Sequence, residues 1–205
     1  MKYAPKKTPH AHASRQLLYV ILAFTLGLAG LTGLVYAFMP VRSDTASVAL
    51  GNAFTLVGAD GRVVTSTDLS GRPYLVFFGY THCPDFCPTT LFDISAVFKE
   101  LGPDKKITAI LVTVDPERDT ADVLKTYLGN FDPRIVGLTG DPLKTEAIAK
   151  AFRVYSKKMP GEKLGDYSVD HSGAIYLMDK RGKFVSVFNL QRPPAEAARE
   201  LEAYF

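Results

Sequence analysis

Cysteine is scarce in this chain of 205 residues, since only Cys83 and Cys87 are present. The part that follows residue 43 has about 160 residues, enough for one domain whose core folds without disulfide staples. The cysteines are therefore not needed as staples, although export would permit a disulfide. Two thiols placed so close together are expected to work together, as a redox dithiol or as a clamp for a soft metal ion.

Charge is absent from a long stretch near the N-terminus. No charged residue lies between Leu17 and Met39, a run of 23 residues, and no acidic residue precedes Asp44. At about 1.5 Å per residue, this run is long enough to cross a bilayer core of about 30 Å. It is too long for the apolar region of a cleaved signal peptide. We therefore expect an uncleaved transmembrane helix and not a buried core helix, because the run is too long for one and has no polar face.

Basic residues are distributed unevenly around this run. Four precede it and one, Arg42, follows it closely, so the positive-inside rule places the N-terminus in the cytoplasm and the remaining chain outside. With these five set aside, residues 44–205 have 19 basic and 21 acidic side chains, a net charge of −2. The high pI thus comes from the anchor, and we expect no nucleic-acid partner.

These observations divide the chain into four parts. We expect a cytoplasmic tail over 1–16, a transmembrane anchor over 17–39, a linker over 40–50 and a folded domain over 51–205. The chain lacks a transit peptide rich in serine and arginine. This favours a single-pass protein of the bacterial inner membrane with a periplasmic domain, and the mitochondrial inner membrane is the alternative.

Apolar strands and amphipathic helices alternate in the first half of the domain, and a hairpin and a closing helix follow. We predict strands over 53–57, 62–65, 74–80, 106–115, 135–138, 174–178 and 184–188, and helices over 88–101, 120–128, 142–152 and 193–204. The polar stretch 156–167 is predicted to be a mobile loop. This order is typical of an α/β thioredoxin-like sandwich, a central mixed sheet flanked by helices. Such a fold places its reactive cysteine after a central strand, at a helix N-terminus.

The cysteine pair lies in that place, between the apolar run 74–80 and the helix that begins at Pro88. A helix N-terminus stabilises a thiolate, so at least one of the two thiols is expected to have a lowered pKa. Thioredoxin-type enzymes have two residues between their cysteines, whereas this pair has three. The wider gap leaves room for an ion, but metal binding, redox exchange and a structural disulfide all stay open.

Histidine is the other scarce ligand, since the exported domain has only His82 and His171. In a thioredoxin-like sheet the last hairpin starts beside the cysteine turn, so His171 could complete a site with Cys83 and Cys87. A surface loop histidine is the alternative. His82 adjoins Cys83 and is the weaker candidate. Asp170 is either an orienting partner of His171 or a solvated acid.

The segment Asp115–Asp119 follows the second long apolar strand and has acidic residues at both ends. Carboxylate oxygens are hard ligands and do not suit a site made of thiolates. We therefore expect a structural role, in which Asp119 caps the helix that follows.

Three segments, in this order, resemble the Sco/SenC family: Phe78–Pro88, Val114–Thr120 and Asp170–Ser172. The resemblance extends over residues 48–204. It implies a membrane-tethered thioredoxin-like protein that assists copper-site assembly in cytochrome c oxidase. It also implies that copper, as Cu(I) or Cu(II), is bound by Cys83, Cys87 and His171.

The partners implied by the resemblance are the copper-bearing subunit of the oxidase and another periplasmic copper chaperone or a thioredoxin-like reductant. We do not expect a classical enzyme, and the alternative function is reduction of the oxidase cysteines by the Cys83–Cys87 dithiol. A thiol peroxidase of this fold would need an arginine near an exposed cysteine, and none lies between Arg72 and Arg118. A tethered scaffold with an inert disulfide is the remaining class.

Overall fold

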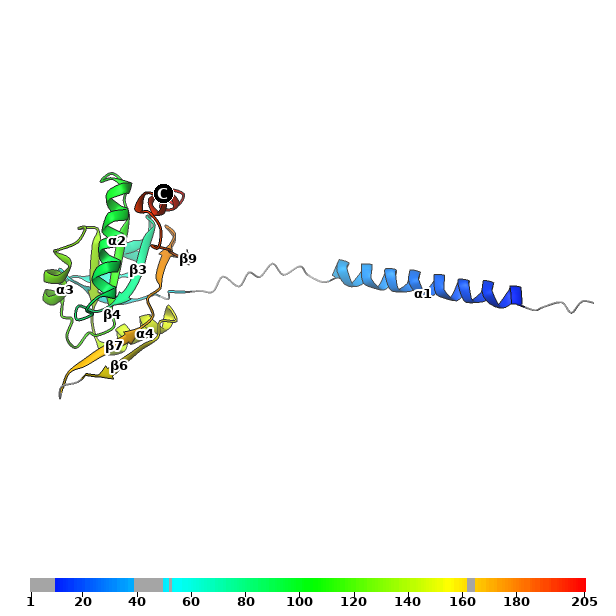
Figure 1. Cartoon of the computed structure of the whole chain (residues 1–205), viewed down its shortest axis with the longest axis horizontal. Helices are drawn as coiled ribbons and strands as arrows, with labels where there is room; N and C mark the ends of the chain where they lie inside the picture. Colours follow the sequence, from blue (N-terminus) through cyan, green and yellow to red (C-terminus); the bar gives the residue numbers. More distant parts are fainter. Residues whose placement is uncertain (1–9, 39–49, 52, 162–164) are drawn as a thin grey trace, which may run out of the picture. The chain divides into compact units, whose positions relative to one another are not determined.

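The computed structural model describes residues 10–38, 50–51, 53–161 and 165–205. The chain forms two units, Met1–Thr45 and Ala46–Phe205. The first contains helix α1 (His10–Phe38) (Figure 1). Its segment Leu17–Leu34 has a mean hydropathy of 2.1 and none of it is buried, so α1 is long and apolar enough to cross a membrane. The predicted linker lies outside the described residues except for Leu50.

The second unit is built on a seven-stranded mixed sheet with the strand order β2-β1-β5-β4-β3-β8-β9. Its three central strands are parallel: β5 (Ile135–Thr139), β4 (Thr108–Thr113) and β3 (Tyr74–Gly79). The outer strands pair antiparallel: β1 (Thr55–Gly58), β2 (Val63–Thr65), β8 (Ile175–Met178) and β9 (Phe184–Val187). The central strands are continuous apolar runs because both faces of a parallel sheet are covered.

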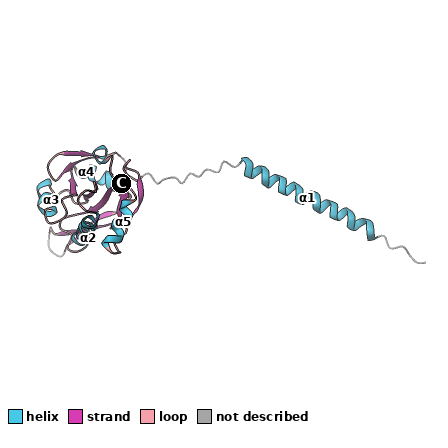
Figure 2. Ribbon diagram, turned by 90° about the horizontal axis from the view of Figure 1, so that it is seen from above, coloured by secondary structure: helices cyan, strands magenta, loops and turns pink. Residues whose placement is uncertain are grey.

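Helices cover both faces of this sheet. On one face lie α2 (Phe86–Leu101), α3 (Ala121–Leu128) and α5 (Pro194–Glu202), and on the other lie η1 (Ser66–Leu69) and α4 (Pro142–Ala151). Figure 2 shows α2 and α5 on one side of the strands and α4 on the other. Strand β3 alternates between the two cores, with Leu75 and Phe77 in one and Val76 and Phe78 in the other. The predicted thioredoxin-like sandwich is confirmed.

Part of the predicted mobile loop 156–167 belongs to a two-stranded sheet. Strands β6 (Ser156–Pro160) and β7 (Tyr167–His171) pair antiparallel, with Ser156 opposite His171 (Figure 1). Every residue of β6 is exposed, so the segment lacks the apolar alternation by which a strand is predicted. The loop prediction is wrong for 156–160 and for Tyr167, because backbone pairing, and not burial, defines these strands.

Candidate metal centre

Cys83 and Cys87 lie where β3 ends and α2 begins. Helix α2 starts at Phe86, two residues before the predicted start, so Cys87 is in its first turn. The backbone N–H of Cys87 donates to Cys83 Sγ at 3.4 Å. The first N–H groups of a helix have no acceptor within the helix. The sulfur of Cys83 therefore satisfies one of them, and the helix N-terminus holds the two cysteines together.

The two thiols differ in exposure. Cys87 is fully buried, Cys83 is half-buried, and both are free. Burial raises the pKa of the Cys87 thiol, because desolvation disfavours the thiolate. The sequence predicts a lowered pKa for at least one of the two thiols, and Cys87 is not that thiol, because its pKa is raised. A cation beside this sulfur would offset the desolvation, so the turn is better suited to hold an ion than to keep a free thiolate at Cys87.

His171, the last residue of β7, brings its ring to the cysteine pair. Its Nε2 lies 3.7 Å from Cys87 Sγ, and its Nδ1 lies 3.2 Å from the carbonyl oxygen of Ser172. A carbonyl only accepts, so Nδ1 carries the proton and Nε2 offers its lone pair. One ligand atom from each of Cys83, Cys87 and His171 lies within 4.8 Å of the other two. The fold thus assembles ligand types that bind copper or zinc.

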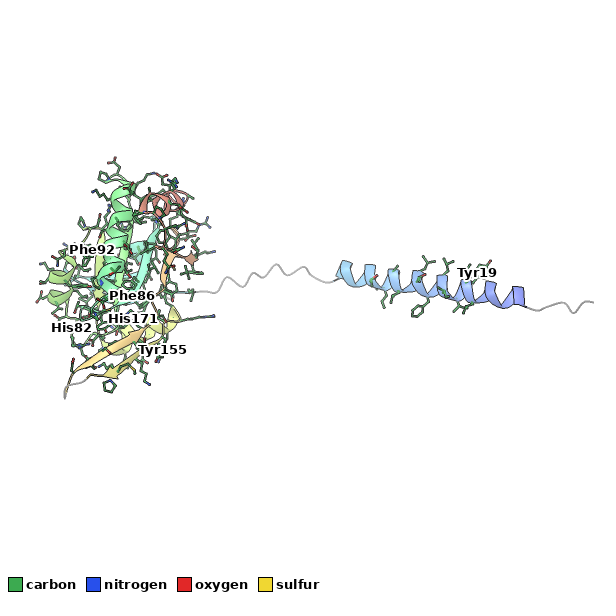
Figure 3. All side chains as sticks on the ribbon, viewed as in Figure 1. Tyr19, His82, Phe86, Phe92, Tyr155 and His171 are labelled. Atoms are coloured by element: carbon green, nitrogen blue, oxygen red, sulfur yellow. The ribbon has the colours of Figure 1, made fainter. Side chains whose placement is uncertain are left out.

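Aromatic rings pack around this imidazole. The ring centroids of Phe77, Tyr80 and Phe86 lie 6.4, 5.8 and 6.2 Å from that of His171, all edge-on. Figure 3 shows Phe86 and His171 next to each other, and Phe86 is 48% exposed. These edge contacts favour one orientation of the imidazole. Because Cys83 and His171 stay partly exposed, a second molecule can still reach an ion held here.

Two other candidates lie outside this cluster. Asp170 is exposed, and the carbonyl of Ser172, not Asp170, orients the ring of His171. Of the two alternatives, Asp170 is therefore a solvated acidic residue. His82 is also exposed, and its Nδ1 lies 3.1 Å from Thr81 Oγ.

Asp119 is fully buried and anchors the start of the cysteine turn. Its carboxylate accepts from Thr81 N–H at 3.1 Å, from Thr81 Oγ at 2.6 Å and from Thr113 Oγ at 2.6 Å. The cap of helix α3 is instead Thr120, whose Oγ accepts from the N–H of Val123. The predicted capping role of Asp119 is wrong because its carboxylate binds the cysteine turn and β4.

Asp115 is also fully buried and joins the same loop to β7. It pairs with Arg118 and accepts from Tyr167 OH at 2.8 Å. The Arg118 guanidinium donates to the Tyr167 carbonyl at 3.0 Å and lies 3.7 Å from the centre of the Tyr167 ring. Tyr167 begins the strand that His171 ends. The sequence shows two acidic residues four positions apart, Asp115 and Asp119. It gives no sign that Tyr167, 52 residues from Asp115, is a hydrogen-bond partner.

Comparison with protein families decides what kind of protein this is. The model of the SCO1/SenC family matches residues 42–205, which include the cysteine turn, the Asp115–Asp119 loop and His171. The chain belongs to the SCO1/SenC family. The resemblance carried by the three sequence segments is thereby confirmed.

Relatives of this SCO1/SenC protein include solved structures. ScoI from Bradyrhizobium japonicum, solved with copper bound, is 51% identical with a TM-score of 0.74, over 77% of this chain and 100% of that one. BsSco is 25% identical with a TM-score of 0.62, over 76% of this chain and 93% of that one. It is described as a member of the Sco family of cytochrome c oxidase assembly proteins, with a disulfide switch. The mitochondrial SCO1 homolog of Mus musculus is 37% identical over 158 residues, 76% of this chain. The chain spans only 56% of the length of that relative.

The cysteine turn of this SCO1/SenC protein leaves no room for a side chain at Gly79. A Cβ there would lie 2.8 Å from Cys87 Sγ and 3.0 Å from the Phe77 ring. We expect Gly79→Ala to lower the free energy of unfolding by about 1–3 kcal/mol, as overpacked cores do. The control is Gly129→Ala, whose Cβ would meet nothing nearer than 3.4 Å. Chemical denaturation compares the variants, and equal stabilities would contradict this packing.

Proposed function

We propose that this protein is a membrane-anchored copper chaperone that assists copper-site assembly in cytochrome c oxidase. The observation that carries the proposal is the cluster of Cys83, Cys87 and His171, whose ligand atoms lie within 4.8 Å of one another. Thiolate and imidazole ligands suit copper and zinc better than hard cations. The copper-bound relative at 51% identity supports copper as the cargo, and the description of BsSco supports the oxidase as the destination.

In this mechanism the reduced cysteine pair and His171 bind one copper ion. Each cysteine must be deprotonated to serve as a ligand, so binding releases a proton from each thiol. Nε2 of His171 already presents its lone pair, because the Ser172 carbonyl holds the proton on Nδ1. Thiolates favour Cu(I) and imidazole also suits Cu(II), so the ligand set accepts either oxidation state.

The ion leaves by ligand exchange with thiolates of the copper-bearing oxidase subunit. Cys83 and His171 are partly exposed and are displaced first, and the buried Cys87 is displaced last. Oxidation of both cysteines to a disulfide transfers two electrons to an oxidant and releases two protons. Because it removes both sulfur ligands, oxidation stops copper binding, and a thioredoxin-like reductant would restore it.

Helix α1 supports a location at a membrane. The proposed organisation is a cytoplasmic tail over 1–16, an anchor over 17–39, a linker over 40–50 and a copper-binding domain over 51–205. The basic residues before the anchor favour a cytoplasmic N-terminus and a periplasmic domain. Identity of 51% with the Bradyrhizobium japonicum protein, against 37% with the mouse mitochondrial protein, favours the bacterial inner membrane.

The second candidate function is reduction of cysteines on the oxidase subunit. It is favoured by two free cysteines at a helix N-terminus, which is where thioredoxin-like proteins place a reactive dithiol. A peroxidase is disfavoured because Arg118 is paired with Asp115. Within the described part of the chain, no hydrogen bond joins an arginine to either sulfur.

The test is a copper titration of the reduced domain, residues 46–205, against a competing Cu(I) chelator. This unit has its own sheet and cores, and a solved relative consists wholly of the matching part. We expect one ion per domain. His171→Ala should weaken binding by more than about tenfold, or ~1.4 kcal/mol, because a ligand is lost. Its exposed neighbour provides the matched control, Asp170→Asn, which should bind like the wild type.

Equal affinity of His171→Ala and the wild-type domain would contradict the three-ligand site. If the reduced wild-type domain took no copper from the chelator, the chaperone proposal would fail and the reductase would be favoured. The reduction potential of the Cys83–Cys87 pair would then be the quantity to measure.

A further inference from the structure

Three basic side chains line one cavity at the edge of the sheet where β3 and β4 begin. The cavity has a volume of about 190 Å³ and is lined by Arg72, Lys106 and Lys180, with Ser70 and Tyr204 also in its wall. The three cations come from the turn before β3, the loop before β4 and the turn between β8 and β9. The volume is far more than one water molecule needs, so a small polyatomic group fits.

Hydrogen bonds fix the backbone on two sides of this cavity. The N–H of Gly71 donates to the carbonyl of Lys180 at 2.8 Å, which joins the turn before β3 to the β8–β9 turn. Gly71 has a φ of +90°, a conformation that glycine adopts readily. Asp179 Oδ1 accepts from the N–H groups of Arg181 at 2.8 Å and Lys183 at 2.9 Å, which holds the β8–β9 turn. The cavity is therefore formed before any ligand binds.

The three cations of the cavity have no anionic partner. Among the described residues, no ion pair joins Arg72, Lys106 or Lys180 to an acidic side chain. In the same part of the chain, Nε of Arg72 is buried without a hydrogen-bond partner. Guanidinium and ammonium groups donate strong hydrogen bonds to phosphate oxygens. The cavity is therefore suited to a phosphate group.

Acidic residues of the surrounding loops do not neutralise it. Asp68, Asp104, Asp179 and Glu202 belong to these loops or to the last helix, and none of them lines the cavity. Asp68 caps η1, Asp179 binds its own turn, and Glu202 pairs with Lys105 at 3.9 Å. Asp104 is exposed to solvent, where its charge is screened. The cavity thus keeps its positive charge.

The cavity and the metal centre lie at opposite ends of β3. Pro73, which lines the cavity, precedes the first residue of this strand, and the cysteine turn follows the last. At about 3.3 Å per residue, the strand separates the two sites by roughly 17 Å. Figure 1 marks the C-terminus, next to Tyr204, at the upper end of the domain, and Figure 3 labels His171 lower down in the same view. A surface bound at the cavity therefore leaves the metal centre open.

We propose that this cavity binds a phosphate group, and that the phosphate belongs to the anionic headgroup of a membrane phospholipid. Helix α1 is long and apolar enough to cross a membrane, so it would keep the domain at a high effective concentration of headgroups. The exposed side chains of Arg181 and Lys183 extend the positive surface beside the cavity. Docking there would turn the metal centre away from the bilayer, towards other proteins. The inference is independent of copper, because the cavity shares no residue with the metal centre.

Net charge alone does not explain such an attraction. Residues 44–205 have 19 basic and 21 acidic side chains, a net charge of −2. A domain of this charge is repelled as a whole by an anionic surface, so binding would require a local cluster of cations. A variant of that cluster therefore tests the site.

The test is flotation of the domain, residues 46–205, with vesicles of phosphatidylglycerol and phosphatidylcholine. We expect the wild type to bind, and Lys106→Gln/Lys180→Gln to bind about tenfold more weakly, equivalent to ~1.4 kcal/mol. The matched control is Lys125→Gln/Lys144→Gln, which changes the net charge equally at two exposed lysines that line other cavities. The control should bind like the wild type. Equal binding by the two double variants would overturn the site, as would wild-type binding to phosphatidylcholine alone of the same strength.

A second arm separates a headgroup from free phosphate. Inorganic phosphate is titrated into the same domain, and the amide NMR signals of Gly71 and Lys180 are followed. Shifts that saturate in the wild type and vanish in Lys106→Gln/Lys180→Gln support a phosphate site in the cavity. If these shifts occurred without vesicle binding, the headgroup would be overturned as the source in favour of a soluble phosphate compound. Absence of both phosphate shifts and vesicle binding would overturn the site itself.

Discussion

Asp115→Ala is expected to lower the free energy of unfolding by about 3 kcal/mol, the lower end of the range for breaking a buried ion pair. The Asp115 side chain is fully buried, whereas that of Arg118 is 21% exposed. Removal of the carboxylate leaves the guanidinium without its partner and the Tyr167 hydroxyl without its acceptor. Water can reach Arg118 in part, which is why the lower end of the range applies.

The same substitution should weaken copper binding, although Asp115 is not a ligand. Arg118 and Asp115 together hold the backbone, hydroxyl and ring of Tyr167. Tyr167 is in the strand that ends at His171, so loss of these contacts frees the strand that positions Nε2. Outer residues that orient a metal ligand typically contribute 10–100-fold to affinity, and we expect about tenfold here.

Denaturant unfolding and the chelator competition measure both effects on the reduced domain. The matched control is Glu117→Gln in the same loop, which breaks an exposed ion pair with Lys158 that also reaches the hairpin. Exposed pairs contribute about 0–1 kcal/mol, so this variant should stay close to the wild type. Asp115→Asn is a second variant in case the alanine variant does not fold. If Asp115→Asn and Glu117→Gln had the same stability and affinity, the buried pair would not position β7.

The sheet, its helices and the place of the cysteine turn could be predicted because their signals are local. Apolar runs, helical spacing and a proline at a helix start all lie within a few residues of each other. The β6–β7 hairpin gave no such signal, since β6 is exposed at every residue. Thr81, which binds Asp119, and Tyr167, which binds Asp115, lie 38 and 52 residues away along the chain. An acidic residue carries no mark of such a distant donor.

The pKa of the Cys87 thiol is raised, although the residue lies at a helix N-terminus, and the reason is one of magnitude. A helix N-terminus stabilises a charge by roughly 0.3–1 kcal/mol, or less than about one pKa unit. Full burial can shift a pKa by up to about 3–5 units. The sequence reveals the helix N-terminus but not that Cys87 is fully buried. Burial therefore decides the direction of its pKa.

Cys87→Ala is expected to have the largest effect on copper binding, a loss of more than about 100-fold or ~2.7 kcal/mol. The reason is that Cys87 supplies one of the two sulfur ligands, and its Sγ lies 3.7 Å from His171 Nε2. Alanine keeps the site apolar, so the unfolding free energy should fall by only about 1 kcal/mol, the value of one buried group of methylene size. The chelator competition and denaturant unfolding separate these two effects.

The control for Cys87→Ala is Thr90→Ala in the same helix. Thr90 is also buried, but its hydroxyl donates to the carbonyl of Phe86 and it is not one of the clustered ligands, so this variant should bind copper like the wild type. Wild-type domain oxidised to the disulfide should lose copper as Cys87→Ala does and regain it on reduction.

A tethered scaffold with an inert disulfide requires the opposite result, in which Cys87→Ala supports oxidase assembly as well as the wild type. Loss of copper binding together with loss of assembly would exclude that class, because the fold would be intact and only the sulfur removed.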